Sequence, residues 1–397
     1  MSRRELRMII VVLDGVGVGA MPDAALFHDA GTNTLGHLLQ VIPSIRIPHL
    51  VELGLGQIVP SLCSKGSPPS KGSYGRLRTS NKAKDTICGH WEIAGIVQDP
   101  PFQTYPQGFP VEIVNKWCQR CGIKGVLGNR TASGTVIIEE LGKEHISTGF
   151  PILYTSADSV FQVAAHEEVL SLGRLYDICS VARDLLKPPH LVARVIARPF
   201  KGEPGSYKRT DQRRDFSIAP PGETLLDQIQ SIGAAVVAIG KIDDIFCKRG
   251  ITHIEHTRNN IQGMNAILNH LKNGIDRGLI FANLGDFDTL YGHRRDPRGF
   301  ALALEQFDEA LPSILGALTD EDVLMITADH GCDPTWPHHT DHTREEVPVL
   351  ISGKSIRHGH SLGVRDSLSD LSATILEAFG IAKAKNGRSF WQEVKRK

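Results

Sequence analysis

Five short apolar runs recur along the chain, and four of them lead directly into acidic, basic or histidine residues. The runs cover residues 8–13, 234–239, 279–284, 323–327 and 347–351. Strands of a parallel sheet are covered on both faces, so they read as continuous apolar runs, and ligands gather at their carboxyl ends. The pattern therefore predicts a parallel sheet with a polar site at one edge.

Amphipathic helices are expected between these runs. Apolar residues recur at helical spacing over residues 261–271, 300–311 and 368–379. Pro312 should end or kink the second of these helices, and Gly380 should end the third. Strands that alternate with helices predict an α/β core built on a doubly wound, mostly parallel sheet.

The stretch from about Asp99 to Pro221 does not follow this rhythm. Prolines open and close it, and it contains its own helical pattern over residues 172–186 but no cluster of acidic and histidine residues. A length of 397 residues suggests two or three domains at about 150 residues each. We therefore predict a discontinuous core, residues 1–98 and 222–397, interrupted by an inserted α+β domain, residues 99–221.

Composition excludes several classes of protein. The 44 Lys and Arg balance the 44 Asp and Glu, so the basic excess of a nucleic-acid binder is missing. The apolar runs are far shorter than the roughly 18 residues of a membrane span, and the basic N-terminal stretch precedes too short a run for a secretory signal. Seven scattered cysteines, with one CxxC at Cys118 and Cys121, resemble neither a disulfide framework nor a zinc ribbon. We expect a cytoplasmic protein that binds neither nucleic acid nor membrane.

Acidic and histidine residues gather after three of the predicted strands. The clusters are Asp14; Asp288 with His293; and Asp329 with His330, followed in the next loop by His338, His339, Asp341 and His342. Carboxylates and imidazoles without a thiolate set suit Mn, Mg, Zn or Fe in a two-metal phosphoryl site, with the ions about 3.5–4 Å apart. Taken singly, an Asp at a strand end is usually a cap or turn residue, and a single His is usually a satisfied surface or core residue. Three clusters on separate strands of one sheet favour a metal site.

Thr86 lies in the polar segment 84–92, which contains a second kind of candidate. A hydroxyl beside two divalent cations can be deprotonated at neutral pH and can attack phosphorus. The alternative is that Asp85 or Thr86 only caps a short helix that begins near Ile87. The residues alone leave both explanations open.

Segments 84–95, 286–308 and 329–349 resemble the phosphopentomutase family of the alkaline phosphatase superfamily, and the similarity extends through nearly the whole chain. The resemblance implies an alkaline phosphatase-like core with an inserted cap domain. It also implies an isomerase that interconverts ribose 1-phosphate and ribose 5-phosphate, or the 2-deoxyribose analogues, at two metal ions. Manganese is the expected metal, with magnesium or zinc as alternatives.

The resemblance also implies roles for individual residues. Thr86 would be phosphorylated, and the metal ligands would be Asp14, Asp288, His293, Asp329, His330 and His342. Cys88 stands where the family usually has a second threonine, which points to Thr86 as the reactive hydroxyl. The loop before Asp341 is one residue longer than expected and adds histidines, so His339 is an alternative to His342. The residues that follow His342 keep the family's context and favour it.

The implied reaction passes through phosphothreonine and a pentose 1,5-bisphosphate, after priming by a sugar bisphosphate such as glucose 1,6-bisphosphate. The cap domain would exclude water from the phosphorylated enzyme. A metal-dependent phosphatase or phosphodiesterase on the same scaffold is the main alternative, and a metal-binding protein without turnover is another. A sulfatase is not expected, because residues 332–336 lack the arginine of the Cys-x-Pro-x-Arg pattern.

A mutase must also bind the phosphate that does not react. Arg194, Arg209 and Lys241 are the candidates for this clamp, and Asp158 is the candidate acceptor for sugar hydroxyls. Taken singly, each of the three cations is better explained as a solvated surface charge. However, Arg194 lies within an apolar run, where an unpaired charge is costly, and Lys241 follows a core strand at the edge where ligands gather. The resemblance supports the same three residues.

Overall fold

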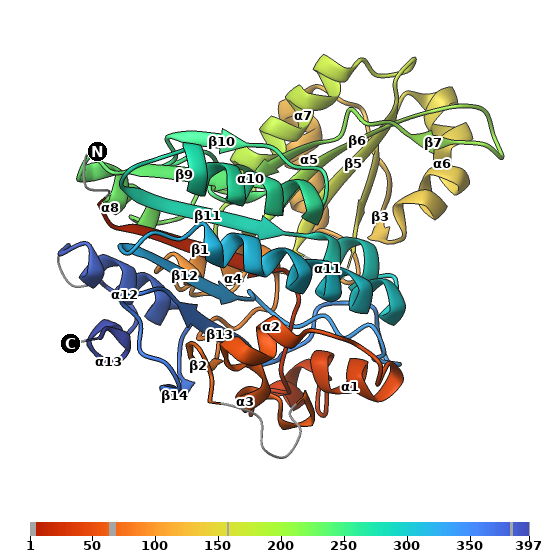
Figure 1. The fold of residues 1–397 in the computed structure, drawn as a ribbon. Coiled ribbons are helices and arrows are strands. Elements are labelled where there is room, and N and C mark those ends of the chain that lie inside the picture. Colours follow the sequence, from red (N-terminus) through yellow and green to blue (C-terminus); the bar gives the residue numbers. More distant parts are fainter. Residues whose placement is uncertain (1–4, 63–68, 157–158, 382–383, 397) are drawn as a thin grey trace. The chain divides into compact units, whose positions relative to one another are not determined.

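One eight-stranded sheet contains all five predicted apolar runs. The structure is a computed structural model and describes residues 5–62, 69–156, 159–381 and 384–396. The strands are β1 (Arg7–Leu13), β2 (Ser73–Leu77), β9 (Ala235–Ile239), β10 (His253–Glu255), β11 (Gly278–Leu284), β12 (Asp322–Thr327), β13 (Val347–Ser352) and β14 (Ser361–Arg365). Their order is β10-β9-β11-β1-β12-β13-β2-β14, and only the pairs that involve β13 are antiparallel (Figure 1). The predicted α/β class with a mostly parallel sheet is confirmed.

Helices cover the sheet on both sides, since β1, β11 and β12 are buried along their whole lengths. α10 packs on β11 and beside α11, whereas α8 packs on β9 and β11 and contacts α12. None of the described helices is long and apolar enough to cross a membrane. The helical elements of this unit are η1 (Ala24–Phe27), α1 (Thr34–Val41), α2 (Pro48–Leu50), η2 (Val51–Leu55), α3 (Gly56–Ile58), η3 (Pro60–Leu62), α4 (Thr86–Ile93), α8 (Leu225–Ser231), α9 (Ile242–Ile245), α10 (Asn260–Asn273), η4 (Phe287–Gly292), α11 (Pro297–Gly316), α12 (Ser369–Ala378) and α13 (Trp391–Val394).

Helix α11 continues through Pro312 to Gly316, so this proline does not end the helix. A proline inside a helix removes one backbone hydrogen bond and destabilises it. Leu311 and Ile314, on either side of the proline, are buried, and their packing offsets this loss. Gly380 follows α12 with φ of 70°, the left-handed conformation that ends many helices at glycine, as predicted.

Residues 100–219 form a second compact unit, separate from the first unit of residues 1–99 and 220–397. Its sheet has the order β3-β4-β5-β6-β7, with β8 paired to β6. The elements are β3 (Leu127–Thr131), β4 (Ile152–Thr155), β5 (Val160–His166), β6 (Arg194–Lys201), β7 (Lys208–Arg209) and β8 (Arg214–Ser217), with α5 (Val111–Cys121), α6 (Gly134–Thr148) and α7 (Leu172–Leu185). Trp117 of α5 and Leu175 of α7 are buried in one apolar cluster, and Ile137 of α6 is buried in another with Phe200 of β6.

A buried ion pair joins β1 to β12 at the amino edge of the large sheet. Arg7 Nε and Nη2 donate to the two carboxylate oxygens of Asp322 at 2.7 and 2.6 Å, and neither side chain is exposed. Burial alone would raise the pKa of Asp322, but the hydrogen bonds from Arg7 and from the Thr319 backbone hold it below its usual range. Arg7 also donates to the carbonyl of Leu271, so one guanidinium connects two strands and a helix.

We expect Asp322→Ala to lower the free energy of unfolding by about 3–5 kcal/mol, because it leaves the Arg7 charge buried without a partner. Urea unfolding followed by circular dichroism measures this loss. Asp320→Ala is the matched control, since Asp320 pairs with Lys354 on the surface, and such pairs contribute about 1 kcal/mol or less. Equal, small losses in the two variants would contradict the stabilising role of the buried pair.

Candidate active site

Three neighbouring parallel strands, β11, β1 and β12, end at the same edge of the large sheet. The predicted clusters follow them there: Asp14 comes after β1, Asp288 lies in η4 after β11, and Asp329 and His330 come after β12. All four side chains are buried. The parallel arrangement thus brings together residues that are more than 300 positions apart in the sequence.

The first donor group consists of Asp14, Asp329 and His330, whose ligand atoms all lie within 4.8 Å of one another. His330 Nε2 is 3.5 Å from Asp14 Oδ1 and 3.2 Å from Asp329 Oδ2. Among the described residues, no donor bonds to Asp14 Oδ1, although this atom is fully buried. A buried carboxylate oxygen without a donor is costly. A cation bound here would remove that cost, so the group fits a divalent metal ion.

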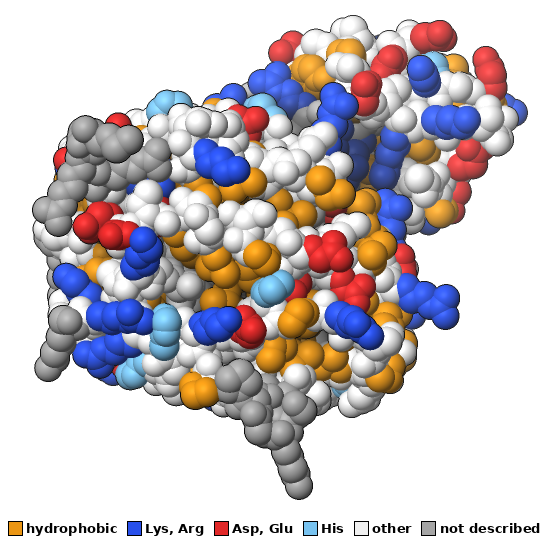
Figure 2. Space-filling view, in the orientation of Figure 1, with side chains coloured by type: hydrophobic (Ala, Val, Ile, Leu, Met, Phe, Trp, Pro, Cys, Tyr) orange, Lys and Arg blue, Asp and Glu red, His pale blue; other side chains and the backbone are white. Residues whose placement is uncertain are grey.

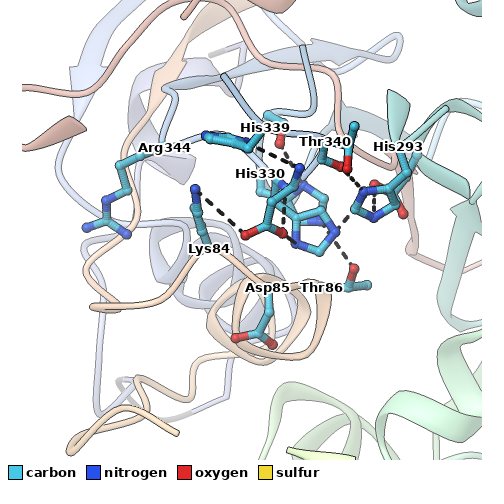
Figure 3. Close-up of polar contacts among 12 residues, drawn as sticks. Lys84, Asp85, Thr86, His293, His330, His339, Thr340 and Arg344 are labelled. Atoms are coloured by element: carbon cyan, nitrogen blue, oxygen red, sulfur yellow. Dashed lines mark hydrogen bonds and ion pairs between the residues drawn. The ribbon is translucent and has the colours of Figure 1, made fainter. Parts of the chain in front are cut away.

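The second donor group, which we define around Asp288, consists of Asp288, His293 and His342. The ligand atoms of Asp288 and His342 also lie within 4.8 Å of one from His330, and those of Asp288 and His293 within 4.8 Å of the Cys332 sulfur. Asp288 Oδ1 is buried, accepts no hydrogen bond within the described chain, and lies 3.3 Å from His293 Nε2 and 3.4 Å from His342 Nε2. His293 Nδ1 lies 2.6 Å from the carbonyl oxygen of Thr340, so Nδ1 carries the hydrogen and Nε2 is left as a ligand (Figure 3). The rings of His330 and His342 are 4.0 Å apart, so the two groups adjoin.

His339 contacts a different carboxylate. Its Nε2 lies 2.7 Å from Asp29 Oδ1, and Asp29 also accepts hydrogen bonds from Lys84 Nζ and from the Arg344 backbone. Figure 3 shows His339 and Lys84 on this side of the site, away from His293. Since His342 lies beside Asp288, the geometry favours His342 over His339 as a metal ligand.

Burial and mutual repulsion set the charge states at the site. Burial, together with the neighbouring carboxylates of Asp329 and Asp288, raises the pKa of Asp14 to about 7. Burial alone would also raise the pKa of Asp288, but His342 and His293 hold it below its usual range. Burial lowers the pKa of His330 to about 4, which keeps its ring neutral and able to bind a metal. Crowded carboxylates beside the neutral ring of His330 are a donor set that divalent cations stabilise.

We expect divalent-cation affinity to rise about tenfold per pH unit up to about pH 7 and to level off above it, because a cation must displace the proton of Asp14. The dissociation constant of Mn²⁺, measured from the free ion by electron paramagnetic resonance, tests this. Asp14→Asn should bind more weakly and lose the slope. The stability of the metal-free protein depends on pH in the opposite direction. The pKa of Asp14 is higher in the folded protein than in the unfolded chain, so the contribution of Asp14 to the free energy of unfolding is lost as the pH rises from about 4 to 7. A pH-independent affinity would contradict the prediction.

Thr86 is the first residue of α4 and faces the first donor group. Its Oγ1 lies 3.1 Å from His330 Nε2 (Figure 3). Asp85 caps the helix by accepting a hydrogen bond from the Cys88 backbone at 3.0 Å. Gly89 allows α4 to lie close to the loop that contains Asp329, since a Cβ at position 89 would lie 2.5 Å from the carbonyl oxygen of Asp329. The capping role therefore belongs to Asp85, and the Thr86 hydroxyl is left toward the donor group.

The four predicted substrate-binding residues divide between the two units. Lys241 lies in the first unit, before α9, with Nζ 3.9 Å from Asp14 Oδ2. Arg194 and Arg209 belong to the second unit, where Arg194 pairs with Asp215 at 3.6 Å and Arg209 donates to the Tyr154 hydroxyl at 3.1 Å. Asp158 lies outside the described residues.

Three buried residues at the site were missed by the sequence analysis. Asn283 donates to Asp14 Oδ2 at 2.9 Å, and His90 Nδ1 lies 3.1 Å from Asp329 Oδ2. The Cys332 thiol belongs to a possible donor group with Asp288, and burial raises its pKa. The signal for Asn283 was its place as a polar residue near the end of an apolar run. The signal for His90 was its position four residues after Thr86, which puts the two side chains on the same face of a helix.

The chain is similar to known proteins over nearly its whole length. A model of the metalloenzyme superfamily matches residues 6–383, which include both units. A phosphopentomutase from Caldanaerobacter subterraneus subsp. tengcongensis is 52% identical over 388 residues, covering 98% of each chain. A phosphopentomutase from Symbiobacterium thermophilum is 51% identical over 395 residues, covering 98% of this chain and 99% of the other. One from Alkaliphilus metalliredigens is 50% identical and covers 97% of this chain and 98% of its own.

Proposed function

This chain belongs to the phosphopentomutase family of the metalloenzyme superfamily, and from that membership we propose that it interconverts ribose 1-phosphate and ribose 5-phosphate, or their 2-deoxyribose analogues. The observation that supports this most is the hydroxyl of Thr86, 3.1 Å from His330 of the first donor group, which the second donor group adjoins. Small pentose phosphates are the proposed substrates, and the cytoplasm is the proposed location.

The donor groups divide between two divalent cations, with Mn²⁺ expected and Mg²⁺ or Zn²⁺ as alternatives. Asp14, Asp329 and His330 would hold one ion, and Asp288, His293 and His342 the other. When bound, such ions neutralise the charge that develops on a transferring phosphoryl group.

Thr86 carries the phosphoryl group in the proposed resting enzyme. A free hydroxyl of the pentose monophosphate attacks the phosphorus, the bond to Thr86 Oγ1 breaks, and the sugar's proton ends on Oγ1 as the 1,5-bisphosphate forms. After the bisphosphate turns, Oγ1 attacks its other phosphate and is phosphorylated again, which releases the isomer. The N-terminus of α4 favours negative charge at this position.

Two further parts of the proposal concern the start and the protection of this cycle. A sugar bisphosphate such as glucose 1,6-bisphosphate phosphorylates Thr86 initially. The second unit, residues 100–219, acts as the cap that excludes water, so that phosphothreonine reacts with sugar rather than being hydrolysed.

Incubation with ribose 1-phosphate, Mn²⁺ and glucose 1,6-bisphosphate distinguishes the candidate functions. The mutase produces ribose 5-phosphate, whereas a phosphatase of the same superfamily releases inorganic phosphate. A metal-binding protein without turnover leaves the sugar phosphate unchanged. Either of the last two results would overturn the proposed function.

We expect Lys241→Ala and Arg194→Ala each to raise the KM for ribose 1-phosphate at least about tenfold, roughly 1.4 kcal/mol, because each removes a cation from the proposed phosphate clamp. Arg209 is the third proposed member, and Asp158 the proposed acceptor for sugar hydroxyls. Arg194→Lys should also weaken binding, since lysine cannot bind phosphate in the bidentate manner. Lys354→Ala, on the surface, is the control. Unchanged KM and kcat in both alanine variants would place the clamp elsewhere.

A further inference from the structure

We propose that His90 and Asn283 are positioning residues: a buried bridge, made of hydrogen bonds and of one close contact between His90 and Asp329, that holds the Thr86 helix and two metal-binding carboxylates in one fixed geometry. Neither residue belongs to the donor groups, and both are buried. The inference rests on the proposed function in one respect, since it takes Asp14 and Asp329 as metal ligands and Thr86 as the nucleophile.

His90 lies on α4 one turn after Thr86, with its side chain fully buried. Its Nδ1 lies 2.9 Å from the carbonyl oxygen of Thr86 and 3.1 Å from Asp329 Oδ2. The Thr86 carbonyl can only accept, so Nδ1 carries the hydrogen and donates it there, while Asp329 Oδ2 lies beside the same nitrogen without accepting a hydrogen bond. The ring also stacks on Phe281 of β11, with centroids 6.0 Å apart and planes inclined by 22°. Packing and hydrogen bonding therefore fix the orientation of the ring.

Asn283, near the end of β11, continues the connection on the other side of the ring. Its Nδ2 lies 2.9 Å from Asp14 Oδ2 and 3.1 Å from His90 Nε2. An ionised Asp14 can only accept, so the amide group that faces it is the NH₂. The same NH₂ faces His90 Nε2, which must therefore accept its second hydrogen. The two sets of contacts agree on one arrangement, in which Nδ1 of His90 donates and Nε2 accepts.

The bridge connects α4 to the ends of three neighbouring strands of the large sheet, β11, β1 and β12. It runs from the Thr86 carbonyl on α4, through His90 beside Asp329 after β12, to Asn283 on β11 and Asp14 after β1. Partners behind the metal ligands orient the ligand atoms, and their loss typically weakens metal binding or activity by about 10- to 100-fold. His90 thus ties the distance between the Thr86 hydroxyl and the carboxylates to one buried ring.

His90→Leu tests the bridge because it removes the hydrogen bonds of the ring to the Thr86 carbonyl and to Asn283, while leucine still fills the buried space. We expect its Mn²⁺ dissociation constant, measured by electron paramagnetic resonance without substrate, to rise about 10- to 100-fold. His90→Asn should recover most of the affinity, since its amide NH₂ can occupy the place of Nδ1–H. His145→Leu is the matched control: His145 is equally buried, and its Nδ1 and Nε2 contact the Phe150 carbonyl and the His166 backbone in the second unit.

Wild-type affinity in His90→Leu, or an equal loss in His145→Leu, would overturn the inference. If His90→Leu does not fold, ¹⁵N spectra of histidine-labelled, Mg²⁺-loaded wild-type protein decide the matter. They should show one buried ring protonated at Nδ1 and unprotonated at Nε2 that is absent from His90→Asn, and the opposite tautomer would contradict the bridge. Because Mn²⁺ binding is measured without turnover, a protein that binds Mn²⁺ through this bridge but does not isomerise ribose 1-phosphate would overturn only the proposed function.

Discussion

Thr86→Ala lowers kcat for the interconversion of ribose phosphates by at least about a thousandfold, whereas Thr86→Ser retains part of the activity. The reason is that the hydroxyl 3.1 Å from His330 is the only atom proposed to carry phosphate between the two half-reactions. Serine keeps the oxygen but loses the methyl group that restricts its rotamer. Coupled assays of ribose 5-phosphate formation, at saturating Mn²⁺ and primer, measure the loss.

The fold and the metal content of Thr86→Ala should remain unchanged, because Asp85 rather than Thr86 caps α4. Ser80→Ala is the matched control, since Ser80 is a nearby hydroxyl that donates to the Asp366 carbonyl. Peptide mapping after incubation with glucose 1,6-bisphosphate should place one phosphate on Thr86. Phosphate on Ser80 or Thr79, or full activity of Thr86→Ala, would refute the assignment of the nucleophile.

Removal of divalent ions by a chelator abolishes activity, and restoration requires two equivalents of Mn²⁺ per chain. The physical reason is that buried carboxylate oxygens of Asp14 and Asp288 have no donor among the described residues, so the site is complete only with cations present. Asp288→Asn should lose one of the two ions, because it neutralises the carboxylate shared by His293 and His342. Metal analysis of dialysed protein by inductively coupled plasma spectrometry gives the stoichiometry.

Asp286→Asn is the control for this experiment, because Asp286 is two residues away and accepts a hydrogen bond from the Asn260 backbone instead. It should retain both ions and most of the activity. A fully active protein with one ion or none would contradict the two-metal site.

The sequence analysis predicted the central sheet because buried parallel strands read as apolar runs. It missed β10 and β14, which are mostly exposed edge strands at the two ends of the sheet, and β2, which alternates between buried and half-buried residues. It also could not show that β13 is antiparallel, since an apolar run carries no information about strand direction. Pro312 was expected to end or kink α11, but the helix continues to Gly316. The low helix propensity of proline did not end it, because the residues on either side of Pro312 are buried in the core.

The candidate site was predictable where residues follow strand ends, as for Asp14, Asp288 and Asp329. His342 could not be separated from His339 by spacing, because the difference depends on which carboxylate each ring reaches: Asp288 for His342, and Asp29 for His339. The bridge of His90 and Asn283 also required the structure, since it joins residues almost 200 positions apart. Sequence patterns indicate periodicity and strand ends but not contacts between distant side chains.

Surface charge gives a further view of the molecule. Figure 2 shows Lys and Arg side chains interspersed with Asp and Glu over much of the face that it presents. This mixture agrees with the balanced composition, in which 44 basic residues match 44 acidic ones.

The transfer of a labelled phosphoryl group tests the central proposal most directly. The enzyme is first phosphorylated with glucose 1,6-bisphosphate that carries ¹⁸O in its phosphates, freed of excess primer, and mixed with unlabelled ribose 1-phosphate and Mn²⁺. Mass spectrometry should show that the label leaves Thr86 and enters ribose bisphosphate and ribose 5-phosphate, while inorganic phosphate stays unlabelled. Label that appears in inorganic phosphate, with none in the sugar, would show that the phosphoenzyme is hydrolysed and that the chain is not a mutase.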